Sequence, residues 1–318
     1  TLSPNTFTRE GYEFAGWSKE ASGQVEYADG AQVENLAQSG TTVLYAQWKP
    51  VEYRISYKEA GEHTNPTTYT VETATIVLSD PAARTGYTFA GWVDAQGNAI
   101  TRILTGTTGQ LQLTARWTPH TDTPYTVKHL LEDLDGKGYT LHQQQKLQGT
   151  TDASVTPAVL TLEGFTAPRA QTVTVAADGS TVVEYRYSRN VYALSFKYND
   201  GVTADTRIAA KYGAPITLPA PAKAGYGFGG WYASEILASS AFTAQTMPAQ
   251  SMTLYAKWTA NTYSYTVNHY IEELDGTWSL AHTESITGIM DSKLTPAVRS
   301  YTGFTSPEAQ TVTVGVNN

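Results

Sequence analysis

Apolar and polar residues alternate along several short stretches of the chain, and this alternation predicts β-strands. Residues 53–57 read Tyr-Arg-Ile-Ser-Tyr and residues 192–198 read Tyr-Ala-Leu-Ser-Phe-Lys-Tyr. Side chains two positions apart lie on the same face of a strand, so each stretch presents one apolar face. Residues 75–78, Thr-Ile-Val-Leu, form a shorter candidate, and Asn199-Asp200-Gly201 predicts a turn after the second stretch. Helix signals are few, so we predict a chain made mainly of strands and turns.

One aromatic pattern occurs three times and defines a first kind of unit, type A. Each copy opens with Gly-Tyr-x-Phe-x-Gly-Trp and closes with a pattern ending in Ala-x-Trp, and six of the seven tryptophans lie in these motifs. The copies occupy 11–17 with 44–48, 86–92 with 113–117, and 225–231 with 254–258.

The spacing within this pattern predicts a hydrophobic core. Period-two spacing places Tyr226 and Phe228 on one face of a strand, and the glycines before Trp231 permit a tight bend or a close approach. Leu254 and Trp258, with the alanine between them, share one face of another strand. Large aromatic side chains would provide the buried area that a unit of ~70 residues needs. The alternative is an exposed aromatic platform that stacks on sugar rings.

A second repeated unit, type B, lies between the type A copies. Tyr125-Thr126-Val127-Lys128-His129 recurs as Tyr265-Thr266-Val267-Asn268-His269, and 170–175 recurs unchanged as 309–314. Equivalent residues are about 140 positions apart in both unit types, as from Gly86 to Gly225 and from Tyr125 to Tyr265, so an A-B pair is itself a larger repeat. The order along the chain is A-A-B-A-B.

These repeats predict five small modules. Their boundaries are 1–49 (type A), 50–118 (type A), 119–188 (type B), 189–259 (type A) and 260–318 (type B). Only ten residues precede Gly11, so we expect the first module to lack its N-terminal part. The last module has no counterpart of 182–187 (Val-Val-Glu-Tyr-Arg-Tyr), so we expect it to lack a C-terminal strand. On this interpretation the chain is a piece of a longer protein.

Composition narrows the classes of partner. The chain has 21 basic and 29 acidic residues and a net charge of −8, which argues against a nucleic-acid partner. No apolar run reaches the ~20 residues that span a bilayer, so we expect no membrane insertion by this segment. Cysteine is absent, which suits a bacterial exterior better than a small secreted animal domain.

Acidic residues and histidines repeat in the type B units and suggest two metal hypotheses. Glu132, Asp133 and Asp135 recur as Glu272, Glu273 and Asp275, each group just before a glycine. They could supply oxygen ligands for calcium, but Asp-Gly is also a common hairpin turn, and we favour solvated hairpin tips. His129, His142, His269 and His282 repeat in the same way. A metal site or pH switch is one interpretation; packing of His129 beside the apolar residues on its strand face is the other.

Nothing in the sequence nominates catalytic, cofactor-binding or metal-binding residues. No Ser-His-Asp, Cys-His or His-Glu-x-x-His arrangement occurs, and the glycine-rich stretch at 225–230 has no glycine-rich equivalent in the other copies. We therefore expect no enzyme activity and no cofactor, and the ligand-binding residues are unknown. Lys–Asn isopeptide cross-links remain an untested alternative means of stabilisation.

The motifs resemble two known families of repeats. The type A units resemble the Listeria–Bacteroides repeat, also called the internalin B-repeat, although Thr114 replaces the usual tyrosine in the second copy. The type B units resemble MucBP (mucin-binding protein) repeats, in which a tyrosine is more usual at the positions of His129 and His269.

The resemblance implies a fold class and a function. It implies mainly-β modules of β-grasp-like (ubiquitin-like) fold, which we expect to form an elongated rod because the linkers are short. It implies a place in a Gram-positive surface protein, extracellular and either anchored to the cell wall or secreted. We expect a non-catalytic adhesin segment that binds host glycoprotein, either mucin-type glycans or immunoglobulin. The alternative is a stalk that holds another ligand-binding or enzymatic domain away from the cell wall. On either interpretation, we expect neighbouring modules of the same chain to be partners.

Overall fold

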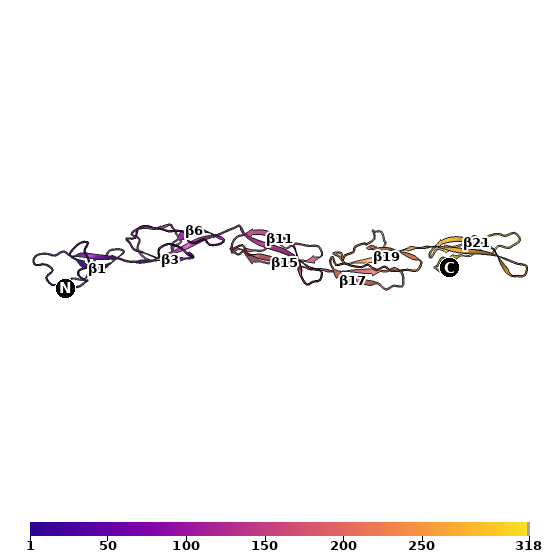
Figure 1. Cartoon of the computed structure of the whole chain (residues 1–318), viewed down its shortest axis with the longest axis horizontal. Coiled ribbons are helices and arrows are strands. Elements are labelled where there is room, and N and C mark those ends of the chain that lie inside the picture. The colour runs from indigo at the N-terminus through magenta and orange to yellow at the C-terminus, as the bar shows by residue number, and fades with distance from the viewer. Residues whose placement is uncertain (317–318) are drawn as a thin grey trace. The chain divides into compact units, whose positions relative to one another are not determined.

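The computed structural model describes residues 1–316, and every regular element in that range is a β-strand (Figure 1). The mainly-β composition predicted from the alternation is therefore confirmed. The alternating stretches correspond to β3 (Tyr53–Lys58), β5 (Ile76–Val77) and β16 (Val191–Lys197). No helix in residues 1–316 is long and apolar enough to cross a membrane.

The strands form separate small sheets that follow one another along the chain. The first 50 residues hold one antiparallel pair, β1 (Tyr12–Ser18) with β2 (Tyr45–Pro50). Residues 53–119 hold a five-stranded sheet of order β4-β3-β9-β6-β7 and the pair β5-β8. Their further strands are β4 (Thr68–Tyr69), β6 (Tyr87–Val93), β7 (Ala99–Ile100), β8 (Arg102–Ile103) and β9 (Leu111–Pro119).

The remaining strands form two four-stranded sheets and three two-stranded pairs. Residues 123–189 hold a sheet of order β11-β10-β15-β13 and the pair β12-β14, and residues 191–260 hold a sheet of order β17-β16-β19-β18. Residues 262–313 hold the pairs β20-β21 and β22-β23. The strands are β10 (Thr123–Glu132), β11 (Tyr139–Gly149), β12 (Ser154–Val155), β13 (Phe165–Thr166), β14 (Val173–Thr174), β15 (Val182–Arg189), β17 (Thr206–Lys211), β18 (Tyr226–Tyr232), β19 (Met252–Ala260), β20 (Thr262–Glu272), β21 (Trp278–Ile289), β22 (Lys293–Leu294) and β23 (Val312–Thr313).

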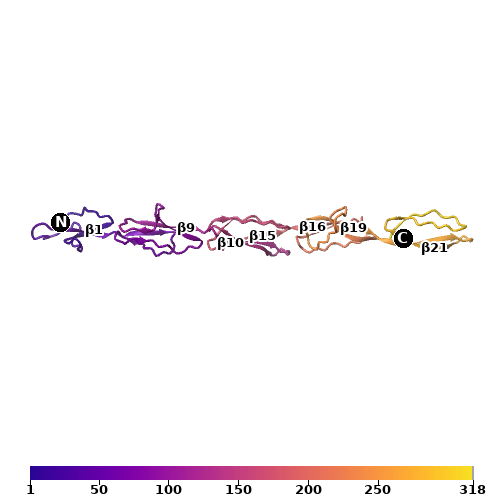
Figure 2. The same ribbon diagram turned by 90° about the horizontal axis from the view of Figure 1, so that it is seen from above.

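The chain divides into two compact units, and the boundary between them passes through the third module. One unit contains 1–127, 145–157 and 171–183; the other contains 128–144, 158–170 and the described residues from 184 onward. Within the second unit, the parallel pair of β16 and β19 lies at the centre of its sheet, with β17 and β18 at the edges. Figure 2 labels the two central strands.

Trp231 is the centre of the core in residues 191–260. Its ring is buried and meets the rings of Phe196, Tyr198 and Phe228 at centroid distances of 4.8, 5.4 and 5.5 Å. The indole Nε1 donates a hydrogen bond of 2.8 Å to the Pro219 carbonyl, so its polar atom is satisfied. The motif tryptophan is therefore a core residue, as the sequence predicts.

The closing motif and the glycines also take the predicted places. Leu254 is buried, and Trp258 packs against the same core from the same face of β19. Gly230 has a φ of 102° and lies in a β-bulge between β18 and β19. The bulge reorients the chain and brings Trp231 onto the core side, which a regular strand with this spacing would not do.

Tyr226 corrects one prediction. Period-two spacing places it in the core beside Phe228, but it is absent from the buried cluster, and its hydroxyl bonds to Asp291 in the next module. Tyr226 is the first residue of β18, so it lies at the end of the sheet, where the chain passes into the following module. Position along the strand, rather than strand face, decides its role.

We predict that Trp231→Ala destabilises this module by about 3–5 kcal/mol, because it removes a large buried aromatic side chain and leaves a cavity. Hydrogen exchange of residues 191–260 measures the effect locally in this multi-module chain. Trp278→Ala is the matched control, since 65% of the Trp278 surface is exposed. We expect it to change stability by less than about 0.5 kcal/mol. Equal effects of the two substitutions would contradict the core assignment.

Candidate functional site at the module junctions and in the last module

The tyrosine of each type A motif joins its module to the next one. In all three copies its hydroxyl donates a hydrogen bond to a carboxylate of the following module, and this bond is the main cause that raises the pKa of the phenol, with burial adding to it. The pairs are Tyr12 with Glu72, Tyr87 with Asp152, and Tyr226 with Asp291. A basic residue three positions earlier lies over each ring. The residues are Arg9 at 3.7 Å, Arg84 at 4.3 Å and Lys223 at 4.2 Å from the ring centroid.

The glycine before each tyrosine also takes part in the junction. Its carbonyl accepts a hydrogen bond from the backbone N–H of the residue at which the chain enters the next module. Gly164 of the type B unit makes the same bond. The donors are Val51 to Gly11 at 2.9 Å, His120 to Gly86 at 2.8 Å, Asn190 to Gly164 at 3.0 Å and Asn261 to Gly225 at 2.9 Å.

Three of these junctions extend the backbone ladder by one more bond. The carbonyls of His120, Asn190 and Asn261 accept N–H groups of the next module at 2.9, 2.8 and 2.9 Å. The donors are Thr151, Tyr212 and Met290, respectively. The first residue of the entering chain thus bonds through its N–H to the preceding module and through its carbonyl to its own module.

Gly86 illustrates why glycine occupies this position. Its φ is +76°, a conformation that residues with a Cβ atom rarely adopt. A Cβ atom there would lie 2.8 Å from the Ala177 carbonyl oxygen and 2.9 Å from the Thr151 hydroxyl oxygen. The position therefore requires glycine both for its backbone angle and for the close approach of the following module.

The junction from the first type B unit into the next type A unit uses charged side chains. Glu132 accepts hydrogen bonds from Lys211 Nζ at 2.9 Å and from the Arg189 backbone N–H at 2.7 Å, and these bonds lower its pKa. Arg189 also donates to the Tyr212 carbonyl at 2.8 Å, and Tyr212 packs edge-on against Phe165. Glu132, considered above as a calcium ligand, is instead part of this junction.

The other repeated acidic residues form hairpin tips. The Gly136 N–H donates to the Asp133 carbonyl at 3.0 Å, and Asp135 accepts from the Lys137 N–H at 2.9 Å. In the second type B unit, Asp275 accepts from the Thr277 N–H at 3.0 Å in the same way. Across residues 1–316 no three or more His, Cys, Asp or Glu side chains converge as a metal site would require.

The repeated histidines have different environments in the two type B units. His129 is fully buried, and its Nδ1 lies 2.8 Å from the Tyr187 hydroxyl. Burial lowers its pKa, and His142 adds to this effect. His269 is only partly buried; its Nε2 lies 3.1 Å from Glu284, and it faces His282 across the β20–β21 ladder. The prediction that His129 packs in the interior is confirmed.

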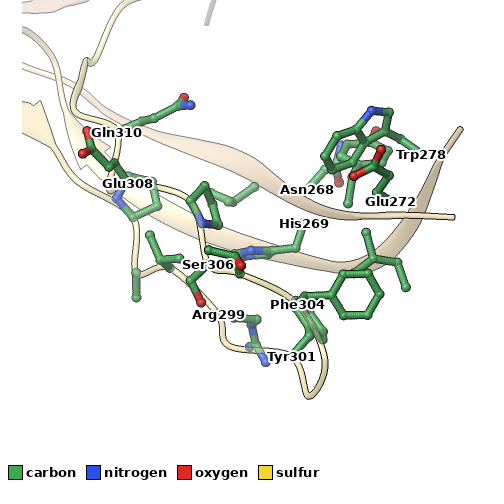
Figure 3. A pocket seen from close by; sticks show the side chains of 18 of the residues that line it. Asn268, His269, Glu272, Trp278, Arg299, Tyr301, Phe304, Ser306, Glu308 and Gln310 are labelled. Carbon is green, nitrogen blue, oxygen red and sulfur yellow. The ribbon is translucent and has the colours of Figure 1, made fainter. Parts of the chain in front are cut away.

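The last module contains an open groove beside β20. The groove has a volume of about 1320 Å³ and lies between this strand and the segment that ends at Val312. His269 reaches toward the part of that segment that carries Arg299 and Tyr301, while Asn268, Glu272 and Trp278 lie on the other side of the strand (Figure 3). Sequence reasoning did not anticipate this groove.

Sequence reasoning also missed the role of the junction residues, although a signal was present. The acidic partner follows the tyrosine by 65 residues in two of the three junctions. A basic residue three positions before the tyrosine recurs in all three copies. Both regularities lie outside the aromatic pattern. They are explained by the contacts that the tyrosine makes with its own module and with the following one.

We predict that Gly86→Ala opens the junction between the second and third modules. The control is Gly106→Ala, since Gly106 has a similar φ of +88° but open space where its Cβ atom would lie. Both substitutions are destabilising because alanine disfavours a positive φ. Only Gly86→Ala also creates a steric clash with the following module. We expect faster hydrogen exchange at the His120 and Thr151 amides in Gly86→Ala alone. Equal exchange in the two variants would show that packing across the junction is unimportant.

We predict that the module at 119–188 loses stability as the pH falls below about 6.5, the ordinary pKa of histidine. The folded-state pKa of His129 is lowered, so the unfolded chain binds more protons in this range and folding weakens with acidity. The pKa of Glu132 is lowered from its ordinary value of 4.5, so this carboxylate does not account for the effect. Hydrogen exchange of β10 between pH 7.5 and 5.5 measures it. In His129→Gln the pH dependence should shrink; an unchanged profile would assign it to another group.

Comparison with known proteins agrees with the repeated motif. The Listeria-Bacteroides repeat domain family matches residues 1–47, 53–116 and 192–257, more than half of the chain. A "Putative Gly-rich membrane protein" of Evansella cellulosilytica is 26% identical over 278 residues, which cover 82% of this chain and 30% of that protein. A "Putative membrane protein" of the same organism is 27% identical over 248 residues, covering 71% and 35%. The chain thus spans about a third of the length of these relatives.

One solved structure resembles the chain weakly. "The Bacillus anthracis TIE protein" aligns over 82% of this chain and 70% of its own, with 8% identity and a TM-score of 0.29. The family match covers instead the three copies of the glycine and aromatic motif. The structure places the second and third copies in buried cores, and the tyrosines of all three copies at junctions. The chain belongs to the Listeria-Bacteroides repeat family.

Proposed function

We propose that this chain is a non-catalytic spacer that holds other parts of a bacterial surface protein at a distance from the cell. The observation that carries the proposal is the recurring junction, in which a glycine carbonyl and a tyrosine hydroxyl both bond to the next module. Modules joined only by a flexible linker would need no such bonds. A spacer whose modules keep a fixed orientation does need them, because each free joint shortens the mean reach of the array.

Several further features support this proposal. Each junction adds contacts to modules of a size that is only marginally stable alone. Relatives named as membrane proteins are about two to three times as long as this chain, which leaves room for an anchor and for a domain to be presented. An extracellular location on a Gram-positive cell, whether wall-anchored or secreted, is part of the proposal, as are the MucBP-like character of the type B units and the elongated arrangement. The mixed sheet of β17-β16-β19-β18 supports a β-grasp relationship.

A second candidate function is adhesion to host glycoprotein. It is favoured by aromatic side chains that are exposed in the last module: Tyr270 is 52% exposed and Trp278 is 65% exposed. Exposed aromatic rings can stack on the apolar faces of sugars, and neither ring is needed to fill a core. Mucin-type glycans are the partner chemistry that these rings would fit, and they are better supported than immunoglobulin.

We predict that the junction tyrosines limit the relative motion of modules. In the triple variant Tyr12→Phe, Tyr87→Phe and Tyr226→Phe, the hydroxyls that reach the next module are lost while the rings remain. Residual dipolar couplings should report one set of inter-module orientations in the native chain and averaged orientations in the variant. The control is Tyr45→Phe, Tyr139→Phe and Tyr270→Phe, three exposed tyrosines. Modules that already reorient freely in the native chain would overturn the spacer proposal.

We predict that adhesion, if this segment performs it, depends on Trp278. Native chain and Trp278→Ala would be compared for binding to immobilised mucin and to released O-glycans. A loss of tenfold or more in Trp278→Ala supports the second function, with Trp17→Ala as a control for a motif tryptophan elsewhere in the chain. Binding by neither protein removes adhesion as a function of this segment and leaves the spacer proposal intact.

A further inference from the structure

The groove in the last module corresponds to a space that is filled in the first type B module. β10 has a strand on each side, β11 and β15. Its equivalent, β20, pairs along its length with β21, the counterpart of β11, and with no other strand of residues 1–316. The other edge of β20 faces the groove of about 1320 Å³. Unpaired N–H and C=O groups on such an edge are a template for another strand.

The rest of the two modules is built in the same way, so the comparison is direct. β12 pairs with β14 as β22 pairs with β23. The hydroxyls of Thr156 and Thr172 are 2.7 Å apart, and those of Thr295 and Thr311 are also 2.7 Å apart. The two modules therefore differ mainly in the presence of the strand beside β10.

In the first type B module, β15 supplies three buried side chains, Val183, Tyr185 and Tyr187. The Tyr187 hydroxyl bonds to His129 Nδ1 at 2.8 Å and accepts the Leu160 N–H at 2.8 Å. Contacts of β10 with this segment advance in the same direction along both chains, so the two strands run parallel. They join Thr126 to Thr181, Lys128 to Glu184, and Glu132 to Arg189.

The equivalents of the residues under β15 are partly uncovered in the last module. Val127 and His129 are fully buried, whereas Val267 and His269 are half-buried and line the groove. Tyr301, also on the groove, has a buried hydroxyl without a hydrogen-bond partner in the described residues. The groove therefore has an apolar floor, a partly buried imidazole and an unsatisfied hydroxyl beside an open strand edge. Figure 3 shows the His269 and Tyr301 side chains.

We propose that this groove accepts a β-strand of the β15 pattern, with apolar and tyrosine side chains at alternate positions. The strand runs parallel to β20, as β15 runs parallel to β10. Its two tyrosines occupy the groove over Val267 and His269, and the second one bonds to His269 in the way that Tyr187 bonds to His129. A linear strand edge with a continuous row of backbone groups fits an extended polypeptide better than it fits a sugar.

The experiment grafts the template strand onto the chain in the matching register. Val175 and Val314 are equivalent residues 139 positions apart, so residue 318 corresponds to 179. The extended protein carries a copy of 180–189 (Ser-Thr-Val-Val-Glu-Tyr-Arg-Tyr-Ser-Arg) after residue 318. Hydrogen exchange of β20 is measured in the original and extended chains. We expect at least tenfold slower exchange in the extended chain, because the strand's free edge becomes paired.

The control extension replaces the second valine and both tyrosines of the graft with serine. It has the same length and polar residues but lacks the side chains that fill the groove, and we expect it to leave β20 exchange unchanged. Equal protection by both extensions, or protection by neither, would overturn the proposal. So would protection of β20 in the unextended chain by mucin O-glycans, because the groove would then be a sugar site.

A substitution in the groove provides an independent test of the proposal. Val267→Asp places a charge on the floor of the groove and should abolish the protection in the extended chain. Exchange of β21 in the same sample shows whether the β20–β21 pair remains folded. Should Val267→Asp stay folded and the graft still protect β20, the strand is not seated in the groove and the proposal fails.

Discussion

A single contact recurs wherever a type A module ends: a tyrosine hydroxyl donates to a carboxylate that belongs to the next module. The glycine before it must adopt a left-handed backbone and leave no room for a Cβ atom, so that the neighbouring module can approach closely. This constraint explains why the motif begins with Gly-Tyr, whereas its Phe and Trp serve the core. One seven-residue sequence thus specifies both the interior of a module and its connection to the following one.

Junctions after type A units and the junction after the first type B unit share a backbone bond but use different side chains. After a type A unit, a phenol and a carboxylate provide the side-chain bond, with a cation over the ring. After the first type B unit, the Glu132 carboxylate accepts hydrogen bonds from Lys211 and Arg189, and Phe165 packs against Tyr212. In both, a glycine carbonyl accepts the N–H of the entering residue, so the backbone pattern is shared while the side chains differ.

The sequence predicted the strands and core residues within each module better than the contacts between modules. Alternation found the strands at 53–57 and 192–198, and the spacing of Leu254 and Trp258 placed them correctly in one core, because strand faces follow directly from local sequence. Tyr226 was assigned to that core incorrectly. Whether a residue on the apolar face meets its own module or the next depends on where the strand ends, which a period-two pattern does not encode.

The groove and Glu132 escaped prediction for the same reason. Glu132 looks like its neighbours Asp133 and Asp135 in sequence, yet only Glu132 lies close enough to Lys211 and Arg189 to bind them. Likewise, β10 and β20 have closely similar sequences, and only the arrangement of strands around them reveals that one has a covered edge and the other an open one.

Both unit types provide a carboxylate that accepts the tyrosine hydroxyl of the preceding module. Glu72 of a type A unit and Asp152 or Asp291 of type B units receive the same hydroxyl, so one outgoing end is compatible with two kinds of incoming unit. A duplicated or deleted A-B segment therefore leaves matching ends behind. Recombination between repeats in the gene would lengthen or shorten the protein by whole modules. Each resulting junction would keep the hydrogen-bonding residues that existing junctions use.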